Sequence, residues 1–239
     1  MLPLPDATAS LLLGSAATLA AVHTLIGVDH SIPFIVMGRA RGWSLRRTLG
    51  VTGVCGLAHV GSSVLIGLVG VGLGVALDRL SWLESARGNL AAGLLIGFGL
   101  AYAAWALWRS FRARAHTHRH THRDGTTHSH AHGHQGKHLH PHGVGHGATP
   151  WALFLVFAFG PCEALIPLMM VPAVEDAWWL LVAVVGVFTV FTVGAMLAAV
   201  ALGYCGLTRA RLGMFEQKID LLAGLTVAAS GAAVLLLGV

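Results

Sequence analysis

The sequence predicts an all-α integral membrane protein with six transmembrane helices. Of its 239 residues, 55% are hydrophobic and only 10% are charged, whereas soluble domains are about a quarter charged. Long stretches with almost no charge alternate with short polar segments. A helix needs about 20 apolar residues to cross the hydrocarbon, and lipid offers backbone groups no water to pair with. We therefore expect helices rather than strands.

The six spans are expected at residues 10–37, 49–76, 89–108, 151–173, 178–204 and 218–238. A polar segment separates the third span from the fourth. We therefore expect a first membrane half over residues 1–109, a loop over 110–148 and a second membrane half over 149–239. The N-terminal MLPLPDATAS lacks the basic region of a cleaved signal peptide, so the first span is expected to be retained.

The distribution of Lys and Arg predicts how the spans cross the membrane. Thirteen of the fifteen cations lie in the first, third and fifth loops, while Arg79 and Arg87 in the second loop are balanced by two acidic residues. Cytoplasmic loops carry the excess of cations, so we expect these odd loops in the cytoplasm. Both termini would then lie outside an inner (plasma) membrane. The net charge of +5 forms no contiguous patch, so the expected partner is the lipid bilayer and not nucleic acid.

Five ionisable side chains fall at membrane depth, namely His23, Asp29, His30, His59 and Glu163. Such residues are costly in lipid, and they usually face the interior of the bundle and serve function. At about 1.5 Å rise per helical residue, three different spans bring them to one central slab. Their convergence predicts a site for metal ions or protons, with structural polar packing as the alternative.

Imidazole and carboxylate together are ligands of divalent ions such as Ni²⁺, Co²⁺, Zn²⁺ and Fe²⁺. His23 and His30 are seven residues apart and would share a face of a regular helix, with Asp29 near enough to orient an imidazole. Cys162 would add a thiolate, although a small buried residue beside a proline explains it equally well. For His59 alone, the alternative is a packed histidine bonded to a backbone carbonyl.

Helix-breaking residues accompany the polar ones in two spans. The first span reads GVDHSIP over residues 27–33, and the fourth reads FGPCEALIPLM over residues 159–169. Proline inside a helix removes a hydrogen bond and opposes the preceding turn. Interrupted helices beside polar residues predict unwound backbone at a midplane site. Because each half has three spans, the two broken spans run in opposite directions, which predicts a three-plus-three inverted repeat.

A histidine-rich segment over residues 115–147 holds twelve of the fifteen histidines. It is too polar and glycine-rich to form a core, so we expect it to be disordered and cytoplasmic. An expression tag would be terminal and uninterrupted, so metal capture is the favoured interpretation. The expected ligands are His116, His118, His120, His122, His128, His130, His132, His134, His138, His140, His142 and His146.

Three motifs resemble a known family. HTLIGVDH in the first span, AHVGSSV in the second and the histidine-rich loop resemble the nickel/cobalt transporter superfamily. FGPCEALIP in the fourth is similar to its six-span branch, labelled urease-accessory or sulfite-exporter-like. The resemblance implies Ni²⁺ or Co²⁺ transport without ATP, a first-span metal site, and His59 as the second-span histidine. The family has four residues between its first histidine and the Asp-His pair, whereas this chain has five. A shared site therefore requires the helix to unwind at Gly27.

These observations predict a secondary permease for divalent transition-metal cations, with His23, Asp29, His30 and His59 as the site. Glu163 would be a further ligand or a proton acceptor. The chain has no nucleotide-binding loop, so ion gradients must supply the energy. A +2 ion gains roughly 4.6 kcal/mol per 100 mV on moving inward, so export, which the histidine-rich loop favours, requires coupling, for instance to protons. The metal is the substrate, and neither enzymatic activity nor a prosthetic group is expected.

Three other functions are compatible with parts of the sequence. A metal-loading accessory protein needs the histidine-rich loop but no pathway through the membrane. A thiol-disulfide conductor needs paired cysteines on two helices, whereas the first-span position that matches Cys162 holds Asp29, and Cys55 lies elsewhere. An anion exporter would need a buried Arg or Lys, and the expected span interiors contain none. The sequence is compatible with a homo-oligomer.

Overall fold

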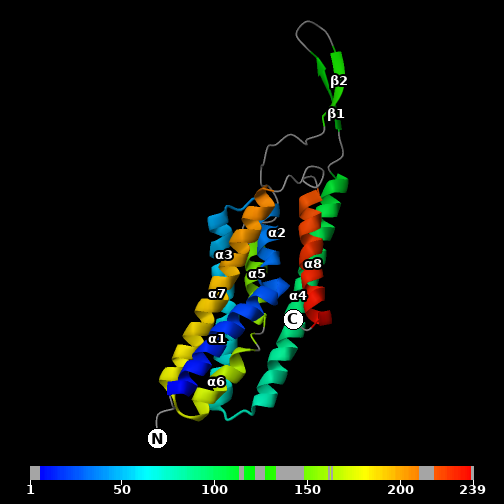
Figure 1. Cartoon of the computed structure of the whole chain (residues 1–239). Coiled ribbons are helices and arrows are strands. Elements are labelled where there is room, and N and C mark those ends of the chain that lie inside the picture. The colour runs from blue at the N-terminus through cyan, green and yellow to red at the C-terminus, as the bar shows by residue number, and fades with distance from the viewer. Residues whose placement is uncertain are drawn as a thin grey trace.

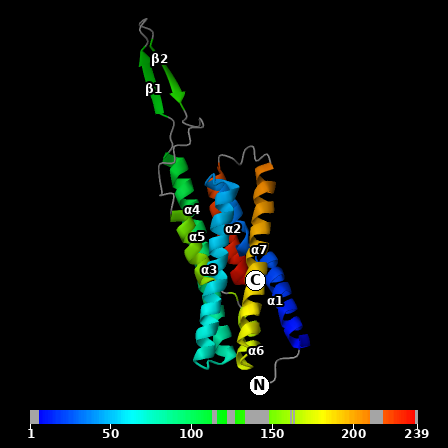
Figure 2. The same cartoon turned by 90° about the vertical axis from the view of Figure 1, so that its left-hand side faces the viewer.

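The computed structural model describes residues 6–112, 116–121, 127–132, 148–160, 162, 164–209 and 218–237. Nearly all of these residues are helical and form one elongated bundle (Figures 1 and 2). The first half of the chain contributes α1 (Asp6–Ile26), the 3₁₀ turn η1 (Val28–His30), α2 (Ile32–Ala40), α3 (Leu45–Gly72) and α4 (Leu77–Arg112). The second half contributes α5 (Ala148–Phe159), α6 (Leu165–Val174), α7 (Trp178–Arg209) and α8 (Ile219–Leu237).

Within the described residues, five helices are long and apolar enough to cross a membrane: Ala7–Ile26, Leu45–Gly72, Leu77–Phe111, Trp178–Leu207 and Ile219–Leu237. By length and composition the chain is thus a helical, multi-pass membrane protein. The region expected as the fourth span is instead two short apolar helices, Thr149–Phe159 and Leu165–Val174. The region expected as the first span is also divided, because η1 separates α1 from the short α2.

The expected start of the third span at residue 89 is wrong. α4 begins at Leu77, twelve residues earlier, and includes Glu84 and Arg87, which the charge pattern had assigned to a loop. The two side chains form an ion pair on adjacent turns of the helix. Because this pairing lets both charges lie against neighbouring helices, a count of charges along the sequence starts the span too late.

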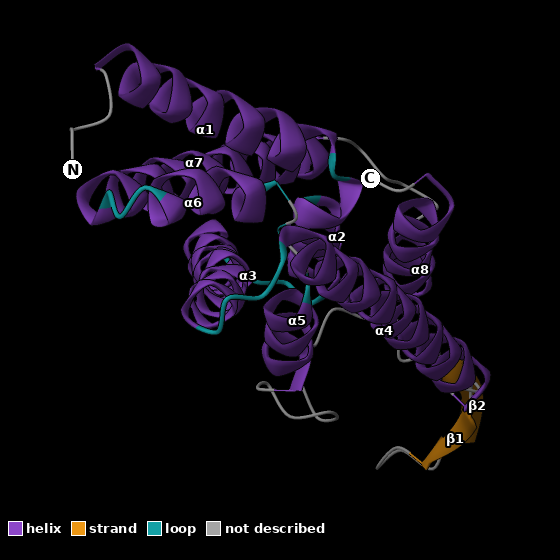
Figure 3. Cartoon of the chain, turned by 90° about the horizontal axis from the view of Figure 1, so that it is seen from below, coloured by secondary structure: helices purple, strands orange, loops and turns teal. Residues whose placement is uncertain are grey.

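The two broken segments pass each other in opposite directions. α1 and α2 together follow the bundle from one end to the other, and α5 and α6 follow it in reverse, with both interruptions near mid-height (Figure 1). Viewed along the bundle, α1 lies beside α7, and α8 lies beside α4 (Figure 3). The interruptions therefore lie in the interior between these pairs.

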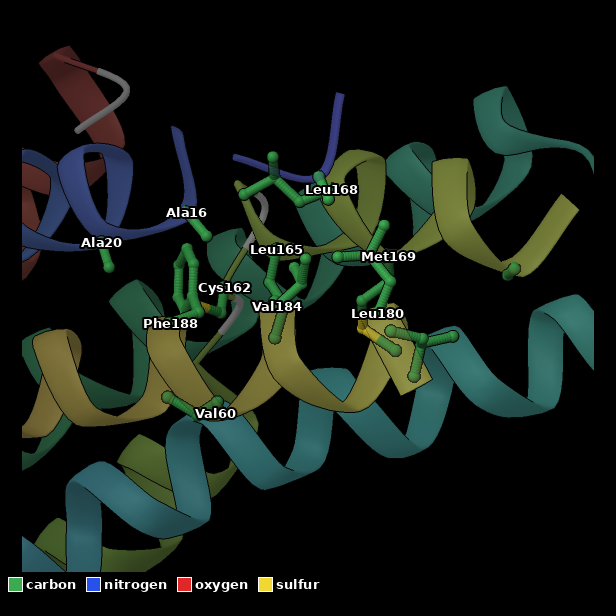
Figure 4. Packing of buried hydrophobic residues seen from close by; sticks show 13 residues of the cluster. Ala16, Ala20, Val60, Cys162, Leu165, Leu168, Met169, Leu180, Val184 and Phe188 are labelled. Carbon is green, nitrogen blue, oxygen red and sulfur yellow. The ribbon is translucent and has the colours of Figure 1, made fainter. Parts of the chain in front are cut away.

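Two apolar cores fill the bundle on either side of the interruptions. One packs small residues of α1 against α3, α6 and α7, as Figure 4 shows for Ala16, Ala20, Val60, Leu165, Met169, Val184 and Phe188. The other joins α2, α5, α7 and α8 through Phe34, Met37, Leu153, Phe157, Met196, Val200 and Val227. Both clusters are held in place by van der Waals packing, since lipid gives no hydrophobic gain for burying an apolar side chain.

Aromatic and basic side chains tie the helices together at one end of the bundle. Arg41, which follows α2, donates from Nη2 to Thr149 Oγ1 on α5 at 2.6 Å, and its guanidinium lies 5.3 Å from the Tyr102 ring of α4. Tyr102 in turn donates to Asp220 Oδ1 of α8 at 2.8 Å. Four helices thus meet at this end, which also carries Arg109 and which we call the basic end.

The histidine-rich segment contains an antiparallel strand pair, β1 (His116–Thr121) and β2 (Thr127–His132). Its register sets His116 opposite His132, His118 opposite His130, and His120 opposite His128. These strands differ from the expected absence of regular structure. Histidine at every second position, alternating mainly with Thr, Ser, Arg and Ala, has the period of a strand.

α4 and α8 approach each other closely at three glycines. A Cβ atom added to Gly224 of α8 would lie 2.6 Å from the backbone nitrogen of Ala103 and 2.7 Å from the carbonyl oxygen of Gly99, both on α4. A Cβ on Gly231 would likewise lie 2.8 Å from the Ala92 carbonyl oxygen. Only glycine permits this separation between the two backbones.

We predict that Gly224→Ala destabilises the protein by about 1–3 kcal/mol, because a methyl group must displace backbone rather than a flexible side chain. Thermal unfolding in detergent measures the effect as a lower Tm. Gly97→Ala on α4 is the matched control, since nothing lies within 4 Å of an added Cβ there. Equal Tm values for the two variants would contradict the close packing of α4 and α8.

Candidate metal centre

The interruption of the first span places Asp29 and His30 on a tight turn inside the bundle. α1 closes with the Gly27 N–H donating to the His23 carbonyl oxygen at 2.9 Å, and Gly27 then leaves the helical conformation with φ −65° and ψ 102°. The His30 N–H donates back to the Gly27 carbonyl oxygen at 3.1 Å and closes the 3₁₀ turn. The unwinding at Gly27 that a shared site requires is therefore present.

Gly27 also makes room for the side chains of this turn. A Cβ atom there would lie 2.8 Å from Cε1 of His30 and 3.0 Å from Oδ1 of Asp29. Pro33 follows within the first turn of α2, where a missing N–H costs no helical hydrogen bond. The breakers thus fix a turn that directs His30 inward.

Three histidines from α1, η1 and α3 converge at this turn. Nε2 of His30 lies 3.3 Å from Nε2 of His59, and both residues are buried. The His23 ring centroid lies 4.9 Å from that of His30. Each of the three offers one ring nitrogen, and these nitrogens lie within 4.8 Å of one another. Among the described residues this is the one group of His, Cys, Asp or Glu that could hold a metal ion.

Asp29 is placed to orient His30. Its Oδ1 lies 3.0 Å from Nδ1 of His30, within ion-pair distance but outside the geometry of a hydrogen bond. A carboxylate on Nδ1 favours the proton on that nitrogen and leaves the Nε2 lone pair free for a ligand. Nε2 of His30, which lies within hydrogen-bond distance of Nε2 of His59, is therefore the atom of His30 that could bind a metal ion.

Several buried atoms of this group have no hydrogen-bond partner among the described residues: His23 Nε2, Asp29 Oδ1, His30 Nδ1 and His59 Nδ1. Buried polar groups are normally paired, and an unpaired one costs about 1–3 kcal/mol. Asp29 Oδ1 and His30 Nδ1 face each other as an ion pair, and the remaining two atoms, His23 Nε2 and His59 Nδ1, indicate a site that accepts a polar or charged ligand.

The spacing fits a divalent ion. Two nitrogens that each lie about 2.0–2.1 Å from one tetrahedral metal are themselves about 3.3–3.4 Å apart. The Nε2 atoms of His30 and His59 lie 3.3 Å apart, which is the separation of two ligands of one such ion. The nitrogen of His23 lies within 4.8 Å and needs a small shift to become the third ligand.

A cavity of about 540 Å³ adjoins the three histidines. Apolar residues of α4 and α5 form much of its wall, and Ser85 and Asn89 of α4 add polar groups. Ser85 and Asn89 lie in the first half of α4, which begins at the end of the bundle opposite the basic end (Figure 1). The cavity thus leads from the histidines toward that end.

The other predicted ligands lie elsewhere. Cys162 is fully buried in the apolar core of α1, α6 and α7, where its backbone N–H donates to Ser63 Oγ and Glu84 Oε2, and it does not join the histidine group. Glu163 lies outside the described residues. Of the loop histidines, six lie on β1 and β2, whereas His122, His134, His138, His140, His142 and His146 lie outside the described residues.

Sequence reasoning missed a buried polar network beside the site. Glu84 and Arg87 of α4 are joined to Ser62 and Ser63 of α3, and Glu84 is completely buried. The expectation that no span contains a buried cation is therefore wrong, since the Arg87 side chain is only 11% exposed. The signal for this network in the sequence was an acidic residue followed three positions later by a basic residue and then by a long apolar run.

Comparisons with models of protein families, with curated proteins and with solved structures find no match to this chain.

We predict that Gly27→Ala lowers by one the number of Ni²⁺ ions bound per purified chain, because the added methyl displaces His30 and Asp29. Equilibrium dialysis in detergent measures the bound ions. Gly14→Ala on α1 is the control, since an added Cβ there meets nothing within 4 Å. The same number of bound ions in Gly27→Ala as in Gly14→Ala would contradict a metal centre at this turn.

Proposed function

We propose that the protein is a secondary transporter of divalent transition-metal cations of intermediate softness, with Ni²⁺ or Co²⁺ as its preferred substrate. The observation that carries the proposal is the group of His23, His30 and His59 at the interruption of a membrane-spanning segment. Neutral imidazoles suit borderline ions, and Zn²⁺ and Fe²⁺ are competing substrates.

The position of the group favours transport over permanent binding. A structural metal site is closed by four protein ligands, whereas here three imidazoles adjoin a cavity. The nitrogens already lie in reach of one ion, yet the site retains room for water or for an exchanging ligand. Interrupted helices at the midplane are a feature of secondary transporters, in which the site is exposed to each side in turn.

Transport against the membrane potential needs coupling. Export of a +2 ion at 100 mV costs roughly 4.6 kcal/mol, which two protons moving inward would offset. We propose proton-coupled export, with the histidine ligands and Glu163 as proton acceptors. Ion binding to imidazole competes with protons, so one group can serve both ions.

The packing of the helices supports a three-plus-three inverted repeat. Exchange of the two halves maps α3 onto α7 and α4 onto α8, and each of these pairs is in contact. The same exchange relates the contact of α1 with α7 to that of α5 with α3, and the contact of α2 with α8 to that of α6 with α4. The six-span interpretation counts α1 with α2, and α5 with α6, as one broken span each.

Charge supports the proposed orientation. The basic end of the bundle carries Arg39, Arg41, Arg46, Arg47 and Arg109, whereas Glu175 and Asp176 lie at the opposite end. We propose that the basic end and the histidine-rich loop face the cytoplasm and that both termini lie outside a plasma membrane. The loop would then collect ions on the side from which export begins.

We predict that His30→Ala and His59→Ala each lower metal flux into proteoliposomes by at least about tenfold, because loss of one ligand weakens a three-nitrogen site. Fluxes of Ni²⁺, Co²⁺, Zn²⁺ and Fe²⁺ are measured with and without a pH gradient. Thr189→Ala is the control, since its hydroxyl bonds only to the Val185 carbonyl oxygen of its own helix. Fluxes in the histidine variants equal to those of the control would refute the site.

Deletion of residues 116–146 separates a transporter from a metal-loading protein. A transporter is expected to keep its maximal flux and to lose flux mainly at low metal concentration, because the loop only raises the local supply of ions. Flux against metal concentration in proteoliposomes tests this. Complete loss of function at every concentration would favour the metal-loading role.

A further inference from the structure

The buried network on α4 lies at the interruption of the fourth span. α5 ends at Phe159 and α6 begins at Leu165, so the described residues between them, Gly160, Cys162 and Ala164, lie outside both helices. Arg87 Nη2 donates to the carbonyl oxygens of Ala158 at 3.2 Å and of Gly160 at 3.3 Å. The Cys162 N–H donates to Glu84 Oε2 at 3.1 Å and to Ser63 Oγ at 3.0 Å. Two side chains of one helix thus satisfy backbone groups on both sides of the interruption.

The charges match the helix ends that they contact. Arg87 meets the C-terminal end of α5, where free carbonyl groups give partial negative charge, and Glu84 meets the chain before α6, where free N–H groups give partial positive charge. Glu84 and Arg87 also form an ion pair with each other. The network is therefore electrically balanced although it is buried.

The same network reaches the metal centre by two routes. Ser62 Oγ accepts a hydrogen bond from Arg87 Nη2 at 2.8 Å and donates to the His59 carbonyl oxygen at 2.9 Å. Gly160, whose carbonyl group Arg87 holds, lies directly against the His59 ring, because a Cβ there would lie 3.1 Å from Nδ1 of His59. Arg87 thereby contacts both the turn that carries His59 and the backbone that supports its ring.

We propose that Glu84 and Arg87 are positioning residues of the metal centre, which hold the interruption of the fourth span against His59 and so set the distance between His59 and His30. The proposal rests on the proposed function and adds two residues from outside the ligand set. Neither side chain touches the ion.

The planar fork of Arg87 is essential to this role. Its terminal nitrogens contact Glu84, Ser62, Ala158 and Gly160 at once. Lysine keeps the charge but offers donors from a single nitrogen, so it cannot span these acceptors. Arg87→Lys therefore separates positioning from charge balance.

The first test compares KM with maximal flux in proteoliposomes of the full chain. Arg87→Lys is expected to raise KM for Ni²⁺ by about tenfold, the effect typical of residues that orient metal ligands. Maximal flux per folded molecule should fall less. Arg79→Lys is the matched control, an exposed arginine two turns earlier on α4, and should keep the wild-type KM. An unchanged KM in Arg87→Lys, or a loss confined to the amount of folded protein, would overturn the proposal.

The second test does not depend on transport. In full chains carrying Cys55→Ala and Cys205→Ala, the buried Cys162 is the remaining cysteine, and a maleimide reports its accessibility. Arg87→Gln and Glu84→Gln should raise its labelling rate at least tenfold, because the interruption is no longer held, while Arg79→Gln should not. Equal labelling rates in the Arg87→Gln, Glu84→Gln and Arg79→Gln chains would overturn the proposal.

The two proposals fail in different ways. Absence of Ni²⁺, Co²⁺, Zn²⁺ and Fe²⁺ flux in the wild type would refute the proposed function alone. The positioning role is then tested by equilibrium binding, with the ion whose binding is lost in His30→Ala. Arg87→Lys is expected to raise the Kd for that ion about tenfold. A Kd equal to that of Arg79→Lys would overturn the positioning role.

Discussion

The structure depends on satisfying backbone hydrogen bonds where two helices are interrupted inside an apolar bundle. Water is absent from the hydrocarbon, so each unpaired N–H or C=O group costs several kcal/mol. The two interruptions meet this constraint differently. At Gly27 the chain closes its own 3₁₀ turn, whereas around Gly160 the partners come from Glu84, Arg87 and Ser63 on neighbouring helices.

This difference explains why imidazoles and an ion pair share the centre of the bundle. At the local turn after Gly27, Asp29 and His30 form an ion pair and His30 Nε2 meets Nε2 of His59, so among the described residues these side chains contact one another. Glu84 and Arg87, by contrast, form hydrogen bonds with backbone groups and an ion pair with each other. In the proposed transporter, one interruption would supply ligands and the other would support His59.

The two ends of the bundle are unequal. At the basic end, Arg41, Thr149, Tyr102 and Asp220 join α2, α5, α4 and α8 through hydrogen bonds. On the other side of the histidines, the cavity continues past Asn89 and Ser85. The observed arrangement is therefore more tightly joined at the basic end than beside the cavity, as one state of an alternating-access protein would be.

The helical membrane class, the interruptions and the polar residues that converge on them could be predicted from the amino-acid sequence alone. Low charge and long apolar runs require helices, and Gly27 and Pro33 mark a break that structure places beside His30. The convergence of His23, Asp29, His30 and His59 followed from their similar depth. Period and depth are properties of a single helix, so they can be read along one chain.

Which polar residues face each other depends on how the helices pack. The packing extends α4 back to Leu77, separates Cys162 from the histidines and sets the largely covered Arg87 against the end of α5. Charge counting placed Arg87 in a loop because the cost of burying a charge depends on its partners. Those partners lie 25 residues away at Ser62 and 73 residues away at Gly160, and only the packing of α3, α4 and α5 brings them together.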